Sequence, residues 1–178
     1  MSKEKLSEKQ FLLILNGPSC GGKSTVSDIL FEKFGGIYKA KNDAIKWLIS
    51  DYDANSQRGI VHEMTLETME VALSHGLSVM KEGGLWEFGS YVKMAKDHNV
   101  PVFVANIEAP WDILFSRFEF RIEAKKNGEK IANVDPVRFK ELYDMYQKNK
   151  TKSELEFDSS EQTPEQISGV IASYIKAH

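Results

Sequence analysis

Residues 17–24 read GPSCGGKS, which matches the phosphate-loop pattern G-x-x-x-x-G-K-[ST] at every fixed position. The apolar run Phe11–Leu15 precedes it and is typical of a strand buried on both faces. Apolar residues at helical spacing follow it, at Val26, Ile29 and Leu30. Glycines let the backbone amides curl towards phosphate oxygens, and the helix adds its dipole. The sequence therefore predicts a strand, a phosphate loop and a helix in succession.

This loop supplies most of the candidate binding residues. Lys23 is expected to reach the β- and γ-phosphates of ATP, and Ser24 to ligate magnesium. The alternative is a glycine-rich turn with a chance GKS, which the preceding strand and following helix disfavour. The expected ATP-binding residues are Gly17, Pro18, Ser19, Cys20, Gly21, Gly22, Lys23, Ser24 and Thr25.

Cys20 is the only cysteine, so no intrachain disulfide can form. Near a helix N-terminus its thiol could have a lowered pKa and respond to redox conditions. The other interpretation is a small filler at a variable position of the loop, and we favour it because the pattern tolerates many side chains there.

Strand-like and helix-like segments alternate along the rest of the chain. Such alternation, with two-sided apolar strands, predicts an α/β fold with a parallel sheet and helices on both faces. The final helix is the best delimited, with Thr163 as N-cap, Pro164 at its first position and Gln166 completing a capping box. The expected strands are 11–15, 36–40, 77–81, 102–105 and 154–157.

Composition predicts one ordinary globular domain over residues 1–178, with 42% hydrophobic and 28% charged residues. The net charge of -3 supplies no field for a polyanion, so bulk nucleic-acid binding is not expected. MSKEKLSEKQ at the start contains no apolar leader core, and no run approaches the roughly 18 apolar residues of a membrane span. We expect a cytoplasmic protein without a membrane partner.

Two classes of phosphate-loop protein are disfavoured. The near match to the guanine-reading N-K-x-D signature, 149–152, has Lys152 in place of the aspartate. The predicted strands also lack a terminal aspartate of the Walker B kind, because they lead into Glu82 and Glu108. The four histidines show no ligand spacing, so a zinc site is not indicated.

In its phosphate loop and order of elements, the chain resembles the small P-loop kinases that include the zeta-toxin, chloramphenicol phosphotransferase and gluconate and shikimate kinase families. The loop is specific, and the other shared features are loose. The resemblance implies a three-layer P-loop NTPase fold, a five-stranded parallel sheet and a mobile helical lid rich in arginine. It also implies ATP and Mg²⁺ as cofactors. Such kinases place an aspartate just after the second strand to serve the acceptor hydroxyl, and the matching residue here is Asp43.

Asp43 opens a predicted helix, so it could instead cap that helix or stabilise its dipole. Asn42 beside it could be the cap and leave Asp43 free for catalysis. We favour the catalytic role, because a phosphoryl acceptor needs a carboxylate within hydrogen-bond reach.

The expected lid covers about 117–138. Arg117, Arg121 and Lys125 recur at four-residue spacing and share one helix face, while an apolar stripe occupies another. Arginines carried by a closing lid can neutralise the charge of a transferring phosphoryl group. The alternative is a solvated basic face paired with neighbouring glutamates. A following helix, beginning at 135–136, carries Arg138, which could close the lid or merely lie on the returning chain.

Two further residues are weaker candidates. Glu82 ends the third expected strand and could hold a magnesium-bound water, or it could be a surface acid in a turn. Arg58 could recognise an anionic acceptor, although we favour the interpretation as a solvated loop arginine. The predicted function is an ATP-dependent kinase that phosphorylates a hydroxyl of a small molecule. The rivals are a polynucleotide 5'-hydroxyl kinase and a non-catalytic nucleotide-binding switch.

Overall fold

The computed structural model describes residues 3–83, 87–126, 135–150 and 152–178. Over these residues five strands form one sheet in the order β2-β3-β1-β4-β5, and every pairing in it is parallel. The predicted five-stranded parallel sheet is confirmed, with strand ends displaced by at most three residues. The strands are β1 (Leu12–Asn16), β2 (Ile37–Ala40), β3 (Ser78–Glu82), β4 (Val102–Glu108) and β5 (Leu155–Asp158).

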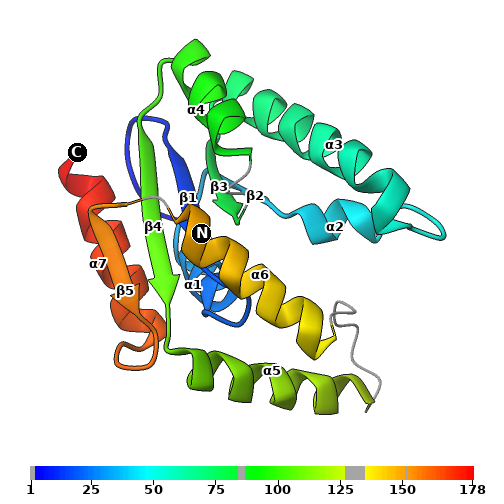
Figure 1. Ribbon diagram of the computed structural model, residues 1–178. Coiled ribbons are helices and arrows are strands. Elements are labelled where there is room, and N and C mark those ends of the chain that lie inside the picture. The colour runs from blue at the N-terminus through cyan, green and yellow to red at the C-terminus, as the bar shows by residue number, and fades with distance from the viewer. Residues whose placement is uncertain (1–2, 84–86, 127–134, 151) are drawn as a thin grey trace.

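β1 is central because both of its faces are apolar, and all five of its residues are buried. Leu13 and Leu15 face one hydrophobic core, while Leu12 and Ile14 face the other. The first core includes residues of α1 (Lys23–Lys33) and α7 (Pro164–Ala177). The second includes residues of α3 (Ala54–Ser74) and α4 (Phe88–Asp97). The sheet is therefore the middle layer of three (Figure 1).

α5 (Trp111–Lys126) and α6 (Pro136–Asn149) lie together beyond the carboxyl end of β4 (Figure 1). They pack through aromatic side chains, and the rings of Phe118 and Phe139 stack with centroids 4.3 Å apart. Leu114 and Phe118 are buried, as predicted for the apolar face of the lid helix. Residues 127–134 of the predicted lid lie outside the described residues.

Two predicted helix starts are confirmed. Thr163 accepts a bond from the Gln166 amide while Gln166 accepts one from the Thr163 amide, which completes the capping box of α7. Asp135 accepts a bond from the Arg138 amide and caps α6, whose first residue is a proline. None of the helices in the described parts of the chain combines the length and apolarity needed to cross a membrane.

Candidate active site

The phosphate loop lies between β1 and α1, pressed against the backbone of β4. A Cβ atom on Gly17 would come within 2.0 Å of the Ile107 carbonyl oxygen, and one on Gly21 within 2.7 Å of the same atom. Gly17 and Gly22 also have φ values of 143° and 97°, which glycine adopts without strain. The motif glycines are therefore required by the close approach of the loop to β4 and by the loop's own path.

The side chain of Lys23 folds back onto the phosphate loop. Its ammonium group donates to the carbonyl oxygens of Gly17, at 2.9 Å, and Pro18, at 2.7 Å. Burial lowers the pKa of Lys23 to about 8, and the nearby Glu82 carboxylate opposes that shift. The side chain is thus placed at the centre of the loop, where a phosphate oxygen could replace a carbonyl as its partner.

Cys20 is buried in the cluster formed by α5 and α6, with its backbone at a φ of 65°. Burial raises the pKa of its thiol, although Arg121, Lys23 and Arg117 oppose the shift. The direction of this shift argues against a redox-sensitive thiolate and agrees with the filler interpretation. Through Cys20, the packing of α5 is coupled directly to the loop.

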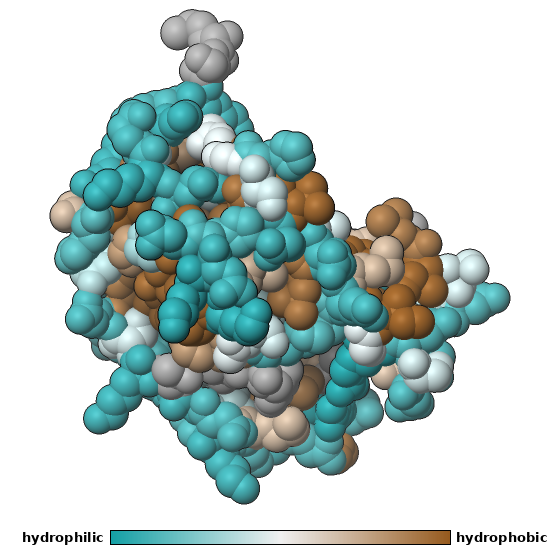
Figure 2. Space-filling view, turned by 90° about the horizontal axis from the view of Figure 1, so that it is seen from above, coloured by the Kyte–Doolittle hydropathy of each residue, from teal (hydrophilic) through white to brown (hydrophobic). Residues whose placement is uncertain are grey.

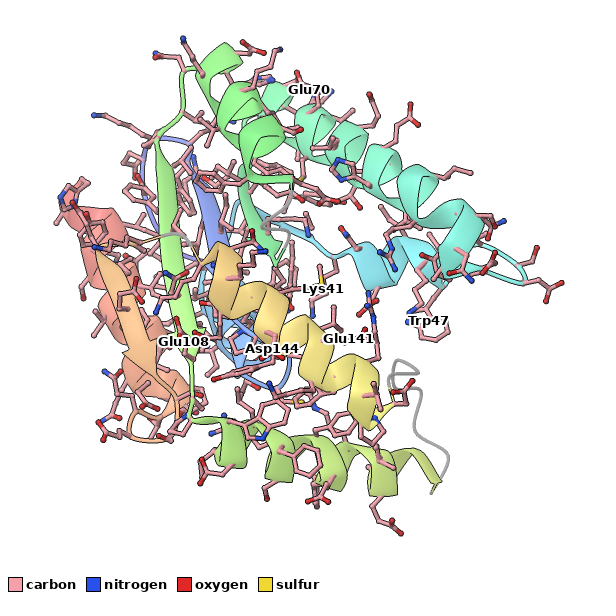
Figure 3. The ribbon with its side chains drawn as sticks, viewed as in Figure 1. Lys41, Trp47, Glu70, Glu108, Glu141 and Asp144 are labelled. Atoms are coloured by element: carbon pink, nitrogen blue, oxygen red, sulfur yellow. The ribbon has the colours of Figure 1, made fainter. Side chains whose placement is uncertain are left out.

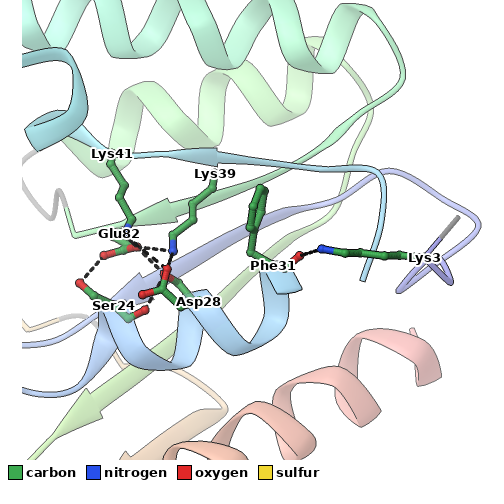
Figure 4. A network of polar contacts seen from close by, with 8 residues as sticks. Lys3, Ser24, Asp28, Phe31, Lys39, Lys41 and Glu82 are labelled. Carbon is green, nitrogen blue, oxygen red and sulfur yellow. Dashed lines mark hydrogen bonds and ion pairs between the residues drawn. The ribbon is translucent and has the colours of Figure 1, made fainter. Parts of the chain in front are cut away.

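Glu82 lies at the carboxyl end of β3, next to the phosphate loop. Its carboxylate accepts a hydrogen bond from the Ser24 hydroxyl at 2.7 Å and another from the Ser27 hydroxyl (Figure 4). Although burial opposes it, these bonds and the ammonium group of Lys41 hold the pKa of Glu82 below its usual range. The carboxylate is therefore ionised beside the hydroxyl predicted to ligate magnesium.

Two lysines of the β2 segment balance this negative charge. The Lys41 ammonium lies 3.1 Å from the Glu82 carboxylate, and that of Lys39 lies 3.7 Å from it (Figure 4). Asp28 of α1 pairs with both lysines. Ammonium groups thus already balance the charge of the Glu82 carboxylate, which is mostly removed from water.

Arg117 and Arg121 both reach the loop, as the lid prediction required, but they lie differently. Arg117 is half-buried, and its guanidinium donates to the Cys20 carbonyl at 3.2 Å and to the hydroxyl and carbonyl of Ser159 at 2.9 and 2.7 Å. Arg121 is exposed and lies near Cys20 and Lys23. Arg117 therefore links α5, the phosphate loop and the turn after β5, while the exposed Arg121 lies against the Cys20 thiol of the loop.

Asp43 follows β2 at the same edge of the sheet. It lies in the first turn of the short helix α2 (Asn42–Lys46), its side chain is 70% exposed, and its ion pair with Lys46 measures 3.6 Å. The N-cap is Lys41, so neither Asp43 nor Asn42, the two candidates, caps this helix. The chain enters α2 from an extended Lys41, and no side chain bonds the first amides. Asp43 is consequently free of a capping role.

The remaining candidates lie apart from the loop. Arg58 is exposed on α3, and Arg138 pairs with Glu141 within α6. A surface hollow of about 660 Å³ runs along α7, but the residues that line it include glutamates and no cation. Such a lining would repel phosphate, so we place the site at the phosphate loop.

The residues at the loop fit a magnesium nucleotide. Among the described residues no group of three metal-ligating side chains gathers that could hold an ion by itself. Mg²⁺ in nucleotide sites is usually held by one or two protein oxygens together with phosphates and waters, which Ser24 and Glu82 could provide. The backbone cradle and Lys23 could hold the phosphates.

Comparison of the sequence with protein-family models gives a match over residues 12–148 to the model described as an AAA domain, AAA_33. The chain belongs to this AAA_33 family. The match begins at β1 and extends to the end of α6, so it includes the phosphate loop, Asp43, Glu82 and both lid arginines. A search of curated proteins finds no match.

Solved structures share the fold. A protein of Chloroflexus aurantiacus assigned as a kinase has a TM-score of 0.71 at 19% identity, with 96% of this chain and 99% of that chain covered. The tunicamycin resistance protein of Deinococcus radiodurans has a TM-score of 0.60 at 16% identity, covering 94% and 96%. A sugar kinase of Janibacter has a TM-score of 0.58 at 15% identity, covering 95% and 99%. The resemblance to small P-loop kinases is confirmed at the level of the fold.

The AAA_33 site also contains residues that sequence reasoning missed. Ser27 bonds Glu82 from one turn beyond the motif, and Lys39 and Lys41 lie two residues apart, at either side of Ala40 at the end of β2. A signal existed for the lysines, since alternate residues of a strand share a face. Nothing in the sequence showed which carboxylate they would meet.

Proposed function

We propose that this AAA_33 protein transfers the γ-phosphoryl group of ATP to a hydroxyl group of a small molecule. The observation that carries the proposal is the contact of the Ser24 hydroxyl with the Glu82 carboxylate beside Lys23. A purely structural glycine-rich turn needs neither a partly buried lysine folded onto its carbonyl groups nor an ionised carboxylate next to its serine. The sugar kinase among the structures of the same fold agrees with a hydroxyl acceptor.

Each side of the loop has a separate task in this proposal. Lys23 and the amides of 17–24 bind the phosphates, and Ser24 with Glu82 holds the magnesium that accompanies them. When bound, Mg-ATP supplies the phosphoryl group and part of the charge neutralisation. Arg121 approaches the transferring group from α5.

The acceptor lies, in this proposal, on the β2 and β3 side of the loop. Parallel strands bring their carboxyl ends to one edge, and ligands of open α/β sheets bind outside that edge. Asp43 is exposed there and carries a charge that contributes to the electrostatic surroundings of Lys81 at the end of β3. Its carboxylate orients the acceptor hydroxyl for in-line attack and takes its proton.

The test is Lys23→Ala against Lys33→Ala, an exposed lysine of the same helix. Titration with Mg-ATP and a screen for acceptor-stimulated ADP release are run on both. We expect turnover to fall by at least about 10³-fold in Lys23→Ala, the scale of other lost phosphate-stabilising groups, and to be retained in Lys33→Ala. Unchanged ATP affinity and turnover in Lys23→Ala would remove the proposal.

The same screen separates the rival functions. DNA and RNA oligonucleotides with a free 5'-hydroxyl are included, and we expect no phosphorylation, because the net charge of -3 gives no field that attracts a polyanion. A nucleotide switch would bind Mg-ATP without transferring phosphate to any compound. Mass spectrometry of the product identifies the phosphorylated hydroxyl.

A further inference from the structure

The two lysines beside Glu82 are held in different ways. The Lys39 side chain is 10% exposed, pairs with Asp28 of α1, and places its ammonium group 5.8 Å from the centre of the Phe31 ring (Figure 4). The Lys41 side chain is 32% exposed and comes from the residue that directly follows β2. Lys39 is therefore enclosed by its partners, whereas Lys41 reaches the same carboxylate from the side open to solvent.

The ammonium group of Lys41 lies between two carboxylates. It is 3.1 Å from Glu82 and 3.7 Å from Asp28, whose side chain is 56% exposed. Figure 3 shows Lys41 at the phosphate-loop edge of the sheet, far from Glu70 at the other end of α3. A lysine stem is flexible, so rotation about its last bonds could exchange one carboxylate for the other. A second position for the Lys41 charge is thus already present beside the first.

The two oxygens of the Glu82 carboxylate have different partners. Oε2 accepts the proton of the Ser24 hydroxyl at 2.7 Å, while Oε1 accepts from Ser27 and lies beside both ammonium groups. A hydroxyl group that donates its only proton keeps its lone pairs for a cation. Ser24 is therefore oriented as a metal ligand, but a cation that approaches Oε1 of Glu82 has to take the place of an ammonium group.

We infer that Lys41 is an exchangeable counter-ion of Glu82, which keeps divalent cations from the Ser24–Glu82 site until a nucleotide brings its phosphates. The inference rests on the magnesium site of the proposed function. The two lysines and the two acids of the network cancel in charge, so a divalent cation alone is repelled by the ammonium groups without a compensating attraction. Phosphate groups supply the negative charge that accommodates the metal ion, and Lys41 then turns to Asp28.

The test measures metal binding without nucleotide and does not depend on turnover. Mn²⁺ is titrated into the nucleotide-free protein, and the electron paramagnetic resonance signal of free Mn²⁺ gives the bound fraction. Lys41→Met should bind Mn²⁺ at least about 10-fold more tightly than the wild type, because it removes a positive charge a few ångströms from the site. Lys33→Met removes the same charge at the exposed end of α1 and should bind as the wild type does.

Two further variants show whether the charge of Lys41 is responsible and where the metal binds. Lys41→Arg keeps the charge and should exclude Mn²⁺ as the wild type does. Glu82→Gln in the Lys41→Met background should return the affinity to the wild-type value, because the carboxylate has gone. Melting temperatures establish that each variant is folded during the titration. Lys41→Gln, which is neutral but can donate to Glu82, replaces Lys41→Met if the latter is unfolded.

The second position of the Lys41 charge is tested by Asp28→Asn. This substitution leaves Glu82 as the carboxylate that both ammonium groups contact, so Mg²⁺ displaces them less easily. The affinity for a non-hydrolysable Mg-ATP analogue should fall about threefold, the scale of a partly exposed ion pair, and the affinity for the metal-free analogue should not fall. Glu32→Gln removes the same charge from an exposed site of α1 and should change neither value. Isothermal titration calorimetry measures both.

Three results overturn the inference. The first is tight Mn²⁺ binding by the nucleotide-free wild type that Glu82→Gln abolishes. The second is that Lys41→Met binds Mn²⁺ as the wild type does, or that its gain survives Glu82→Gln. The third is an unchanged affinity of Asp28→Asn for the Mg-ATP analogue. In each case ATP binding and turnover that depend on Lys23 leave the proposed kinase function standing. Loss of that dependence would remove the proposed function, while the Mn²⁺ titrations would still report on the Glu82 site.

Discussion

The nucleotide side and the acceptor side of the sheet edge are built in different ways. On the nucleotide side, eight consecutive residues form the loop, and Arg117 joins it to Ser159 through three hydrogen bonds. On the acceptor side the polar groups come from α2, α3, β3 and α4. The end of the molecule formed by α2 and the start of α3 also exposes apolar side chains, with Leu48 82% and Trp47 56% accessible (Figure 2).

This difference separates phosphate recognition, which does not depend on the acceptor, from acceptor recognition, which does. Phosphate recognition uses backbone amides and a helix terminus, so a continuous motif is sufficient. Acceptor recognition uses side chains from separate elements, which can change independently while the loop is kept. Substitutions on the nucleotide side should therefore affect all acceptors alike, whereas those on the acceptor side should discriminate among them.

The largest effect on the acceptor side is expected from Asp43→Asn. The substitution keeps the size of the side chain but removes its charge and its basicity. Turnover should fall roughly 10²- to 10⁴-fold, the range of a lost general base, while ATP affinity stays nearly unchanged. Steady-state kinetics and ATP titration measure the two quantities.

Glu82→Gln is the comparison for that prediction. Because Glu82 contacts Ser24, this substitution should instead alter the magnesium dependence of turnover. Full turnover in Asp43→Asn together with a lowered melting temperature would reduce Asp43 to a first-turn acid of α2. The search for the catalytic carboxylate would then move to Glu82.

The two lid arginines should differ on the nucleotide side. Arg121→Ala should lower kcat on the order of 10³-fold, as for arginines that stabilise a transferring phosphoryl group, with little change in ATP affinity. Arg117→Ala should weaken ATP binding as well, because its guanidinium bridges the loop and the turn after β5. Comparing kcat with ATP affinity in each variant checks the assignment. Wild-type turnover in Arg121→Ala would make that arginine a surface charge.

The same difference between the two sides explains how far the sequence could predict this protein. The strands, the phosphate loop and the caps of α6 and α7 follow from local patterns, and the structure has them. His62 and Glu87 are 25 residues apart, and the spacing of histidines gave no reason to pair them. Their contact depends on the packing of α3 beside α4 over β3, which is a tertiary property.

Lys81→Met offers the smallest expected effect and probes the acceptor side through pH. Burial lowers the pKa of Lys81 to about 8 from an ordinary 10.5, although Glu87, Glu82 and Asp43 oppose the shift. Between these two values the unfolded chain holds a proton that the folded protein has lost, so the folded state gains stability as pH rises. Below pH 8 both states are charged, and the full cost of the buried ammonium is present.

The unfolding free energy of the wild type should therefore rise, relative to Lys81→Met, between pH 7.5 and 10.5. The lowering of the Lys81 pKa from 10.5 to about 8 corresponds to a gain in the free energy of unfolding on the order of 3 kcal/mol. Urea titrations at several pH values measure it, and the difference between the two proteins cancels the contribution of Lys23. Lys33→Met makes the same substitution at an exposed site and controls for the loss of a lysine as such. If the difference in unfolding free energy between the wild type and Lys81→Met stayed constant across this pH range, Lys81 would not be a buried cation that costs the fold stability.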